Sequence, residues 1–166
     1  GPSEVMVIAD DESNVSFVAA DLISQAEHGN DSQVVLVTKS QSVADAVVLE
    51  IREQLIQLPR KDLAEESLKN SVVMIVNSKK EVIKTINYYG PEHLILNISN
   101  PEKYIDKIYN AGSVFIGPYT PESAGDYASG TNHALPTNGW AKSYSGVSVD
   151  SFVKKITFQE ITKKGL

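Results

Sequence analysis

Short runs of apolar residues alternate along the chain with longer segments in which apolar residues recur every three or four positions. The short runs have the length of strands and lie at residues 5–9, 34–37, 72–76, 94–98 and 113–116. The longer segments predict helices at about residues 15–28, 40–58, 62–68, 79–89 and 101–110. Strands that alternate with helices pair in parallel through crossover connections. The pattern therefore predicts an α/β fold with an open, mostly parallel sheet and flanking helices.

Residues with special backbone preferences mark the ends of these helices. Gly29-Asn30 and Gly90-Pro91 are typical helix stops, and Pro59 ends the helix that precedes it. Ser40 can cap the second helix. No Gly-x-Gly-x-x-Gly follows the first strand. The chain thus has the sheet pattern of a nucleotide-binding fold without its dinucleotide fingerprint.

The pattern changes after Gly117. Residues 117–150 are rich in Gly, Ser, Thr, Asn and Pro and show no clean period, which is typical of a functional or disordered loop. The Tyr and Trp residues within the loop favour an ordered, functional one. We predict an α/β domain at residues 1–150 that includes this site loop. A C-terminal extension follows at residues 151–166, with a strand at Phe152–Val153 and a short helix from Phe158.

Composition and charge narrow the function classes. The 166 residues fit one ordinary domain, and the absence of cysteine excludes disulfides, thiolate zinc sites and a cysteine nucleophile. A net charge of −6 argues against nucleic-acid and anionic-membrane partners. No apolar run approaches the roughly 18 residues of a membrane span, and the start lacks the order of a signal peptide. We expect a cytoplasmic protein that binds a small molecule or a partner.

Gln25 and His28 lie three residues apart near the end of the first predicted helix, so both side chains project from one face. An imidazole and a neighbouring amide oxygen can hold a divalent ion. Taken alone, the pair favours a polar surface or capping role, because a histidine at a helix C-terminus interacts well with the helix dipole. A metal site is the alternative.

Glu92 and His93 are adjacent and precede a predicted strand. A carboxyl group beside an imidazole suits two separate proton transfers, since both groups can be tuned to titrate near neutral pH. A solvated pair in a loop is the simpler interpretation. Ligands usually gather at the carboxyl ends of parallel strands, whereas this pair sits at the start of one. A site here requires that the strand runs the other way or that the site lies at a domain edge.

Residues 121–133 combine two carboxylates, Glu122 and Asp126, with His133 and several hydroxyl groups in a glycine-rich segment. Glycines let the backbone turn or lie close to a ligand. A hydroxyl-rich linker seldom interleaves aromatic and acidic residues with Asn-His, so the segment favours a functional role. A serine triad is disfavoured because no Gly-x-Ser-x-Gly elbow occurs. The dispersed aromatic residues and acidic charge disfavour a surface that stacks nucleic-acid bases.

Taken together and in order, these clusters resemble histidinol dehydrogenase. The resemblance covers nearly the whole chain, and the ordered set is far more specific than any single motif. The matching segments are residues 1–5, 19–29, 90–94, 121–133, 135–137, 144–146 and 158–160.

The resemblance implies an incomplete Rossmann-like fold, similar to aldehyde dehydrogenases, in a homodimer. It also implies zinc-assisted, NAD-dependent oxidation of L-histidinol to L-histidine, the last steps of histidine biosynthesis. Residue-by-residue matching implies that Gln25, His28 and Asp126 bind both zinc and substrate, with Ser3 and His93 as further substrate contacts.

The same matching implies that Glu92 and His93 are the acid–base pair. His93 would take the proton of the alcohol, and Glu92 would activate the water that hydrates the aldehyde. His133 matches a supportive histidine near the site.

Members of this family are far longer than this chain. The resemblance implies that a fourth zinc ligand, a histidine, lies beyond the C-terminal end, that the NAD contacts lie upstream of Ser3, and that a second subunit completes the site. We therefore expect the chain to fold and to bind zinc weakly, but not to turn over alone.

Two alternatives remain open. A non-catalytic α/β module that binds a ligand or partner could lose Glu92, His93 or Asp126 freely, yet the chain keeps all three. A free-standing zinc hydrolase that uses Glu92 as its base is the weaker alternative.

Overall fold

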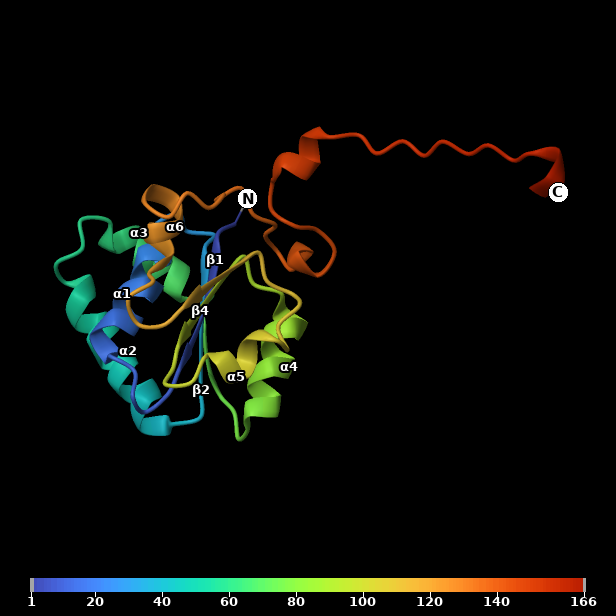
Figure 1. Ribbon diagram of the computed structural model, residues 1–166. Helices are drawn as coiled ribbons and strands as arrows, with labels where there is room; N and C mark the ends of the chain where they lie inside the picture. The colour runs from blue at the N-terminus through green and yellow to red at the C-terminus, as the bar shows by residue number, and fades with distance from the viewer. Residues whose placement is uncertain (1, 166) are drawn as a thin grey trace.

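The computed structural model describes residues 2–165, so Gly1 of the opening motif and Leu166 of the C-terminal extension lie outside the described residues. Within this range, five parallel strands form one sheet in the order β3-β2-β1-β4-β5 (Figure 1). The strands are β1 (Glu4–Ala9), β2 (Gln33–Thr38), β3 (Val72–Ile75), β4 (His93–Asn97) and β5 (Ser113–Ile116). The predicted parallel α/β sheet is confirmed.

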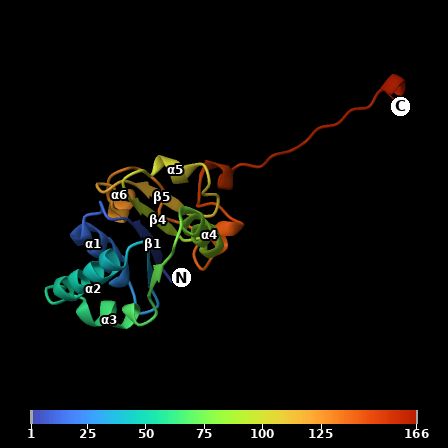
Figure 2. The ribbon, with the colours of Figure 1, turned by 90° about the horizontal axis from the view of Figure 1, so that it is seen from below.

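Helices cover both faces of the sheet, as expected for a doubly wound fold. Figure 2 shows α1, α2 and α3 on one side of the sheet and α4 on the other. The chain changes face after β3, when it returns to place β4 beside β1. No helix within residues 2–165 is long and apolar enough to cross a lipid bilayer. The helices are α1 (Val15–Ala26), α2 (Gln41–Leu55), α3 (Lys61–Leu68), α4 (Lys79–Tyr89) and α5 (Glu102–Ile105).

The central strands are buried on both faces because their side chains alternate between two cores. In β1, Val5 and Val7 pack with α1 and α2, whereas Met6 and Ile8 pack with α4. All six residues of β1 are buried. Fully burying an aliphatic side chain of this size stabilises the fold by about 1.5–3 kcal/mol. β1 is therefore the rigid centre of the sheet.

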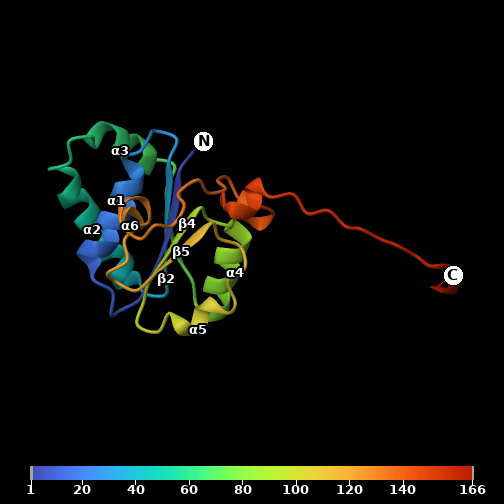
Figure 3. The same ribbon diagram turned by 45° about the horizontal axis from the view of Figure 1, so that its top comes forward.

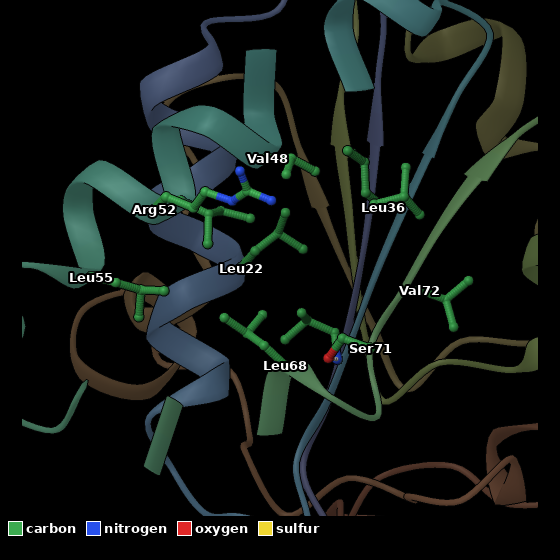
Figure 4. Close-up of a pocket in the computed structure, with 11 residues that line it drawn as sticks. Leu22, Leu36, Val48, Arg52, Leu55, Leu68, Ser71 and Val72 are labelled. Atoms are coloured by element: carbon green, nitrogen blue, oxygen red, sulfur yellow. Dashed lines mark hydrogen bonds between the residues drawn. The ribbon is translucent and has the colours of Figure 1, made fainter. Parts of the chain in front are cut away.

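β3 differs from the central strands because it lies at the open edge of the sheet. Its residues keep 37–46% of their surface exposed. An apolar pocket of about 310 Å³ lies between this edge and the helices, where Leu22, Leu36 and Leu68 face one another (Figure 4). Arg52 and Ser71 are polar among its lining residues. This lining offers no acid–base group that titrates near neutral pH, so the pocket is a poor candidate for an active site.

Three helices are shorter than the sequence predicted. α2 ends at Leu55 rather than at Leu58, so Pro59 is not what ends it. α1 ends at Ala26, so His28 lies in the turn that follows it. α5 ends at Ile105 rather than near Asn110. Asn87 of α4 binds the segment after α5, since its side-chain Nδ2 donates to the carbonyl of Lys107 at 2.8 Å. Its Oδ1 also accepts the N–H groups of residues 109 and 110. These bonds, which no local pattern reveals, replace the helical ones.

Residues 117–150 are less irregular than predicted. They contain the helix α6 (Glu122–Tyr127), the 3-10 helix η1 (Trp140–Lys142) and the start of η2 (Val149–Phe152). α6 is too short to show a helical period. Its glycine and serine are also poor helix formers.

The predicted strand at Phe152–Val153 and the predicted helix from Phe158 are wrong. Residues 153–162 run away from the sheet without regular structure (Figure 3), and η3 (Lys163–Gly165) follows. Within residues 2–165, no strand lies beside this segment to pair with it. Phe152 and Phe158 stay more than 80% exposed, so no packing stabilises a short helix there. The division between residues 1–150 and 151–166 stays a prediction.

Gly112 lies where the chain enters β5 beside the start of β4. A Cβ atom on Gly112 would lie 2.5 Å from the backbone oxygen of Glu92, an atom that cannot move without disturbing the strand pairing. We expect Gly112→Ala to lower the free energy of unfolding by about 1–3 kcal/mol, as overpacking does elsewhere. Urea denaturation measures this change. Gly29→Ala is the matched control, because its nearest neighbour is the flexible carboxylate of Asp31. Equal effects of the two substitutions would contradict the prediction.

Candidate active site

A polar pocket of about 320 Å³ opens at the edge of the sheet where the strands begin. It brings together every site residue predicted from the sequence and adds one more, Glu122. The lining residues are Ser3, Gln25, His28, Glu92, His93, Glu122, Asp126 and His133.

The topology explains why such distant residues meet. Ser3 precedes β1 and Glu92 precedes β4, and these neighbouring strands run parallel. A helix that follows a strand runs back along it, so the end of α1 carries Gln25 to the same edge. Figure 1 shows α6 at that edge as well. Because β4 is parallel to β1, the site lies at the amino edge of the sheet, and a reversed strand is excluded.

The backbone of Glu4 holds both Glu92 and His93. Its N–H donates to Oε2 of Glu92 at 2.9 Å, and its carbonyl lies 3.0 Å from Nδ1 of His93. A carbonyl oxygen only accepts, so Nδ1 carries the proton and the neutral ring presents a lone pair on Nε2. Glu92 and His93 are 6% and 5% exposed, which excludes the solvated loop pair.

Burial tunes this pair for proton transfer. It lowers the pKa of His93, an effect that the bond to the Glu4 carbonyl and the charge of Asp126 partly oppose. Burial, which is the largest cause, and the charges of Glu4 and Glu122 together raise the pKa of Glu92 to about 7, although the bond from the Glu4 N–H opposes this rise. A neutral imidazole and a carboxyl that titrates near pH 7 are suited to general acid–base work.

Gln25 provides the observation that bears on metal binding. Its side chain is 1% exposed, yet neither amide atom has a hydrogen-bond partner among the residues that the structure describes. Leaving a buried polar group unpaired costs about 1–3 kcal/mol. The amide oxygen lines the pocket with His28 and Asp126, so it fits a ligand that the protein itself does not supply. Burial excludes a polar surface role for Gln25.

The other implied zinc ligands lie nearby. The backbone N–H of His28 donates to the carbonyl of Gln25 at 3.2 Å, so the turn keeps His28 at the same end of α1. Asp126 lies 3.4 Å from Nδ1 of His133. Nitrogen and oxygen donors of these kinds suit zinc. Within residues 2–165, no three His, Cys, Asp or Glu side chains could hold a metal ion by themselves, so the predicted set depends on the Gln25 amide.

Glu122 is a site residue whose role the sequence did not reveal. It is 3% exposed, and its Oε1 lies 3.6 Å from Nε2 of His93. Burial, with smaller effects of Asp126 and Asp21, raises its pKa to about 7. The spacing between Glu122 and Asp126 could have indicated this residue from the sequence, because residues four apart lie on the same face of a helix.

Gly125 lets α6 approach the sheet closely. A Cβ atom there would lie 3.0 Å from the ring of Phe115, which itself lies beside the ring of His93. A larger residue would push α6, with Glu122 and Asp126, away from the pair.

Asp21 lies one turn before Gln25 on α1 and is 8% exposed. Burial alone raises its pKa to about 7 from 3.8. The fold therefore favours the protonated form of Asp21. This contribution to stability is fully present below about pH 4 and is lost as the pH rises to about 7. We expect Asp21→Asn to gain stability relative to the parent over this range, by up to about 4 kcal/mol at pH 8.

Urea denaturation across this pH range measures the gain. The exposed Asp11 provides the control substitution to asparagine, since water already hydrates its carboxylate. A gain for Asp21→Asn that does not depend on pH would refute the role of burial.

The bond from His93 to Glu4 predicts one tautomer of the ring. At neutral pH we expect the ¹⁵N NMR shift of Nδ1 to be that of a protonated nitrogen and the shift of Nε2 to be that of an unprotonated one. Because burial lowers its pKa, His93 should stay neutral below the ordinary value of 6.5. A proton found on Nε2 of the neutral ring would show that Glu4 does not orient it.

Comparison with known proteins agrees with this arrangement. A sequence model of the family described as histidinol dehydrogenase matches residues 1–166. A histidinol dehydrogenase of Bacteroides fragilis (strain YCH46) is 57% identical over the whole chain, which covers 39% of that relative. A histidinol dehydrogenase of Yersinia pestis is 54% identical, with 38% of it covered.

A solved structure agrees as well. The crystal structure of histidinol dehydrogenase from Elizabethkingia anophelis matches with a TM-score of 0.95 at 59% identity, covering 99% of this chain and 38% of that one. The chain therefore spans about two fifths of the length of the relatives it matches. With the family matched over all 166 residues and the fold shared with a solved member, the chain belongs to the histidinol dehydrogenase family.

Proposed function

We propose that this chain forms the acid–base and metal-binding part of an enzyme that oxidises L-histidinol to L-histidine with NAD and zinc, the closing steps of histidine biosynthesis. One observation carries the proposal. The seven residues that the family resemblance implies come from four separate segments, and all of them line one pocket. A non-catalytic module would have no need to keep this convergence.

His93 is the proposed base of the first oxidation. Its Nδ1 proton is held by Glu4, so Nε2 has the lone pair that can take the hydroxyl proton of histidinol. Once Nε2 holds that proton, the carbinol carbon could give up a hydride and become the aldehyde, and NAD⁺ would supply the hydride acceptor. Glu122 lies 3.6 Å from Nε2, close enough for one substrate hydroxyl to contact both groups.

Glu92 is the proposed base that hydrates the aldehyde. Its carboxyl group, with a pKa raised to about 7 by burial, can accept a proton from water near neutral pH. The resulting hydrate could then give up a proton to one of these two bases and a second hydride, for which a second NAD⁺ would be the acceptor, to yield the carboxylic acid. The chain contains no cysteine for a thiohemiacetal route.

Gln25, His28 and Asp126 are the proposed zinc ligands in this chain. A bound zinc ion would bind the imidazole and amine of histidinol and thereby hold the reacting carbon beside His93. Ser3, at the edge of the pocket, would contact the substrate through its hydroxyl group. His133, 3.4 Å from Asp126, would support that carboxylate.

The proposal also includes the parts of the whole enzyme that complete the site. The residues that contact NAD, the fourth zinc ligand and a second subunit would complete the site of a cytoplasmic homodimer. By itself, the 166-residue chain is therefore expected to bind zinc weakly and to oxidise no histidinol.

A chimera tests the proposal directly. Residues 1–166 replace the matching segment of the Bacteroides fragilis relative, and the parent chimera should oxidise histidinol with NAD. We expect His93→Ala to reduce kcat by about 10²–10⁴-fold, the usual contribution of a general base. Its zinc content should not change, whereas Gln25→Ala should lose zinc. The exposed Glu65→Gln is the control. Unaltered turnover in His93→Ala would refute the assignment.

A further inference from the structure

Glu4 begins β1 and has two separate sets of contacts. Its backbone holds the acid–base pair, since its N–H binds Glu92 and its carbonyl binds His93. Both bonds involve buried groups, so water does not replace them easily. The position of the Glu4 backbone therefore decides where both side chains point.

The side chain of Glu4 makes a contact of a different kind. Its Oε1 accepts the backbone N–H of Asn138 at 2.6 Å, a bond between residues 134 positions apart. Its Oε2 is buried without a hydrogen-bond partner among the described residues. Burial raises the pKa of Glu4, while the Asn138 N–H and the charge of Lys142 lower it. Burying a carboxylate that keeps one oxygen without a hydrogen bond lowers the stability of the fold. This cost indicates that Glu4 has a role other than packing the strand.

Asn138 belongs to a closed loop that we call the 132–147 loop. Its ends are joined because the side chain of Asn132 donates to the carbonyl of Val147, whose N–H donates to the carbonyl of Ala134. At its middle, Asn138 and Gly139 adopt left-handed backbone angles, with φ of 55° and 74°. This tight turn lies where the Asn138 N–H reaches Glu4 at the start of β1.

A second contact docks the same loop on α4. The ammonium group of Lys142 lies 5.4 Å from the centre of the Tyr88 ring. Gly90 ends α4 with a φ of 67°, and a Cβ atom there would lie 3.1 Å from the Lys142 side chain. The loop is therefore packed at both contacts, and its first turn carries His133 to the pocket.

From this arrangement we propose that Glu4 is a positioning residue that locks the 132–147 loop to the Glu92–His93 pair. Its carboxylate holds the loop while its backbone holds the pair, so neither shifts without the other. The inference rests on the proposed function for the roles of Glu92 and His93. The titratable groups that face Glu92 are Glu4 from β1, His93 from β4 and Glu122 from α6. The negative charge of Glu4 supports the role, since it raises the pKa of Glu92.

Amide hydrogen exchange in the 166-residue chain tests the loop contact. Glu4→Ala removes the acceptor of the Asn138 N–H, so exchange at this amide should become about tenfold faster or more. Glu4→Gln keeps an acceptor oxygen and should stay close to the parent. The exposed Glu12→Gln is the control. Parent-like exchange in Glu4→Ala would overturn the inference.

Kinetics in the chimera test the effect on the pair. Glu4→Ala should lower kcat by roughly tenfold or more, with little change in KM for histidinol or in zinc content. Glu4→Gln should shift the limb of the pH profile that reports Glu92 to lower pH, because a neighbouring negative charge is lost. A merely structural residue would not move that limb, and an unshifted limb would overturn the inference.

The outcomes separate this inference from the proposed function. If Glu4→Ala does not fold, Glu4→Gln still decides through its pH profile. A chimera in which His93→Ala loses turnover but neither Glu4 variant differs from the parent would support the proposed function and reject the role of Glu4. A parent chimera without turnover would reject the proposed function, and exchange at Asn138 would still decide the loop contact.

Discussion

The candidate site depends on the pairing of β1 with β4 at their amino ends. Because Val5 pairs with His93 in parallel register, the backbone of Glu4 lies beside the pair, where its N–H and its carbonyl each meet one of the two side chains. Glu92 takes the donor and the ring of His93 takes the acceptor. A slip of one residue would turn these side chains to the opposite faces of the sheet. The buried core of both strands makes such a slip costly.

This arrangement places the site at the edge of the sheet opposite to the usual one. Open parallel sheets commonly bind ligands at the carboxyl ends of their strands, where the strand order reverses between β1 and β4. Here that edge is bridged, because Asp10 accepts the backbone N–H and the hydroxyl of Ser99, and Ser13 donates to the carbonyl of Asn97. The amino edge instead gathers the polar groups, since α1 and α6 both return to it.

The amino edge carries polar groups whose burial the protein does not fully compensate. Gln25 is buried with both amide atoms unpaired among the described residues, and burial raises the pKa of Asp21, Glu92 and Glu122 to about 7. Such groups weaken a fold unless a ligand or a reaction uses them. Their concentration around one pocket contrasts with the aliphatic pocket beside β3 and agrees with a site for acid–base chemistry.

Much of the fold was predictable from the sequence, because hydrophobic periodicity is a local property and the order of strands and helices follows from it. The candidate site residues were predicted from ordered motifs, such as Glu92-His93. The length of α5, the helix α6 and the course of residues 151–165 were not predictable in this way. They depend on contacts distant in the chain, such as those of Asn87, or on the lack of a neighbouring strand. The sequence by itself determined which chemical groups are present. Only the tertiary structure decided that Glu4 joins residues 92, 93 and 138, because hydrogen bonds between such distant positions exist only once the sheet has formed.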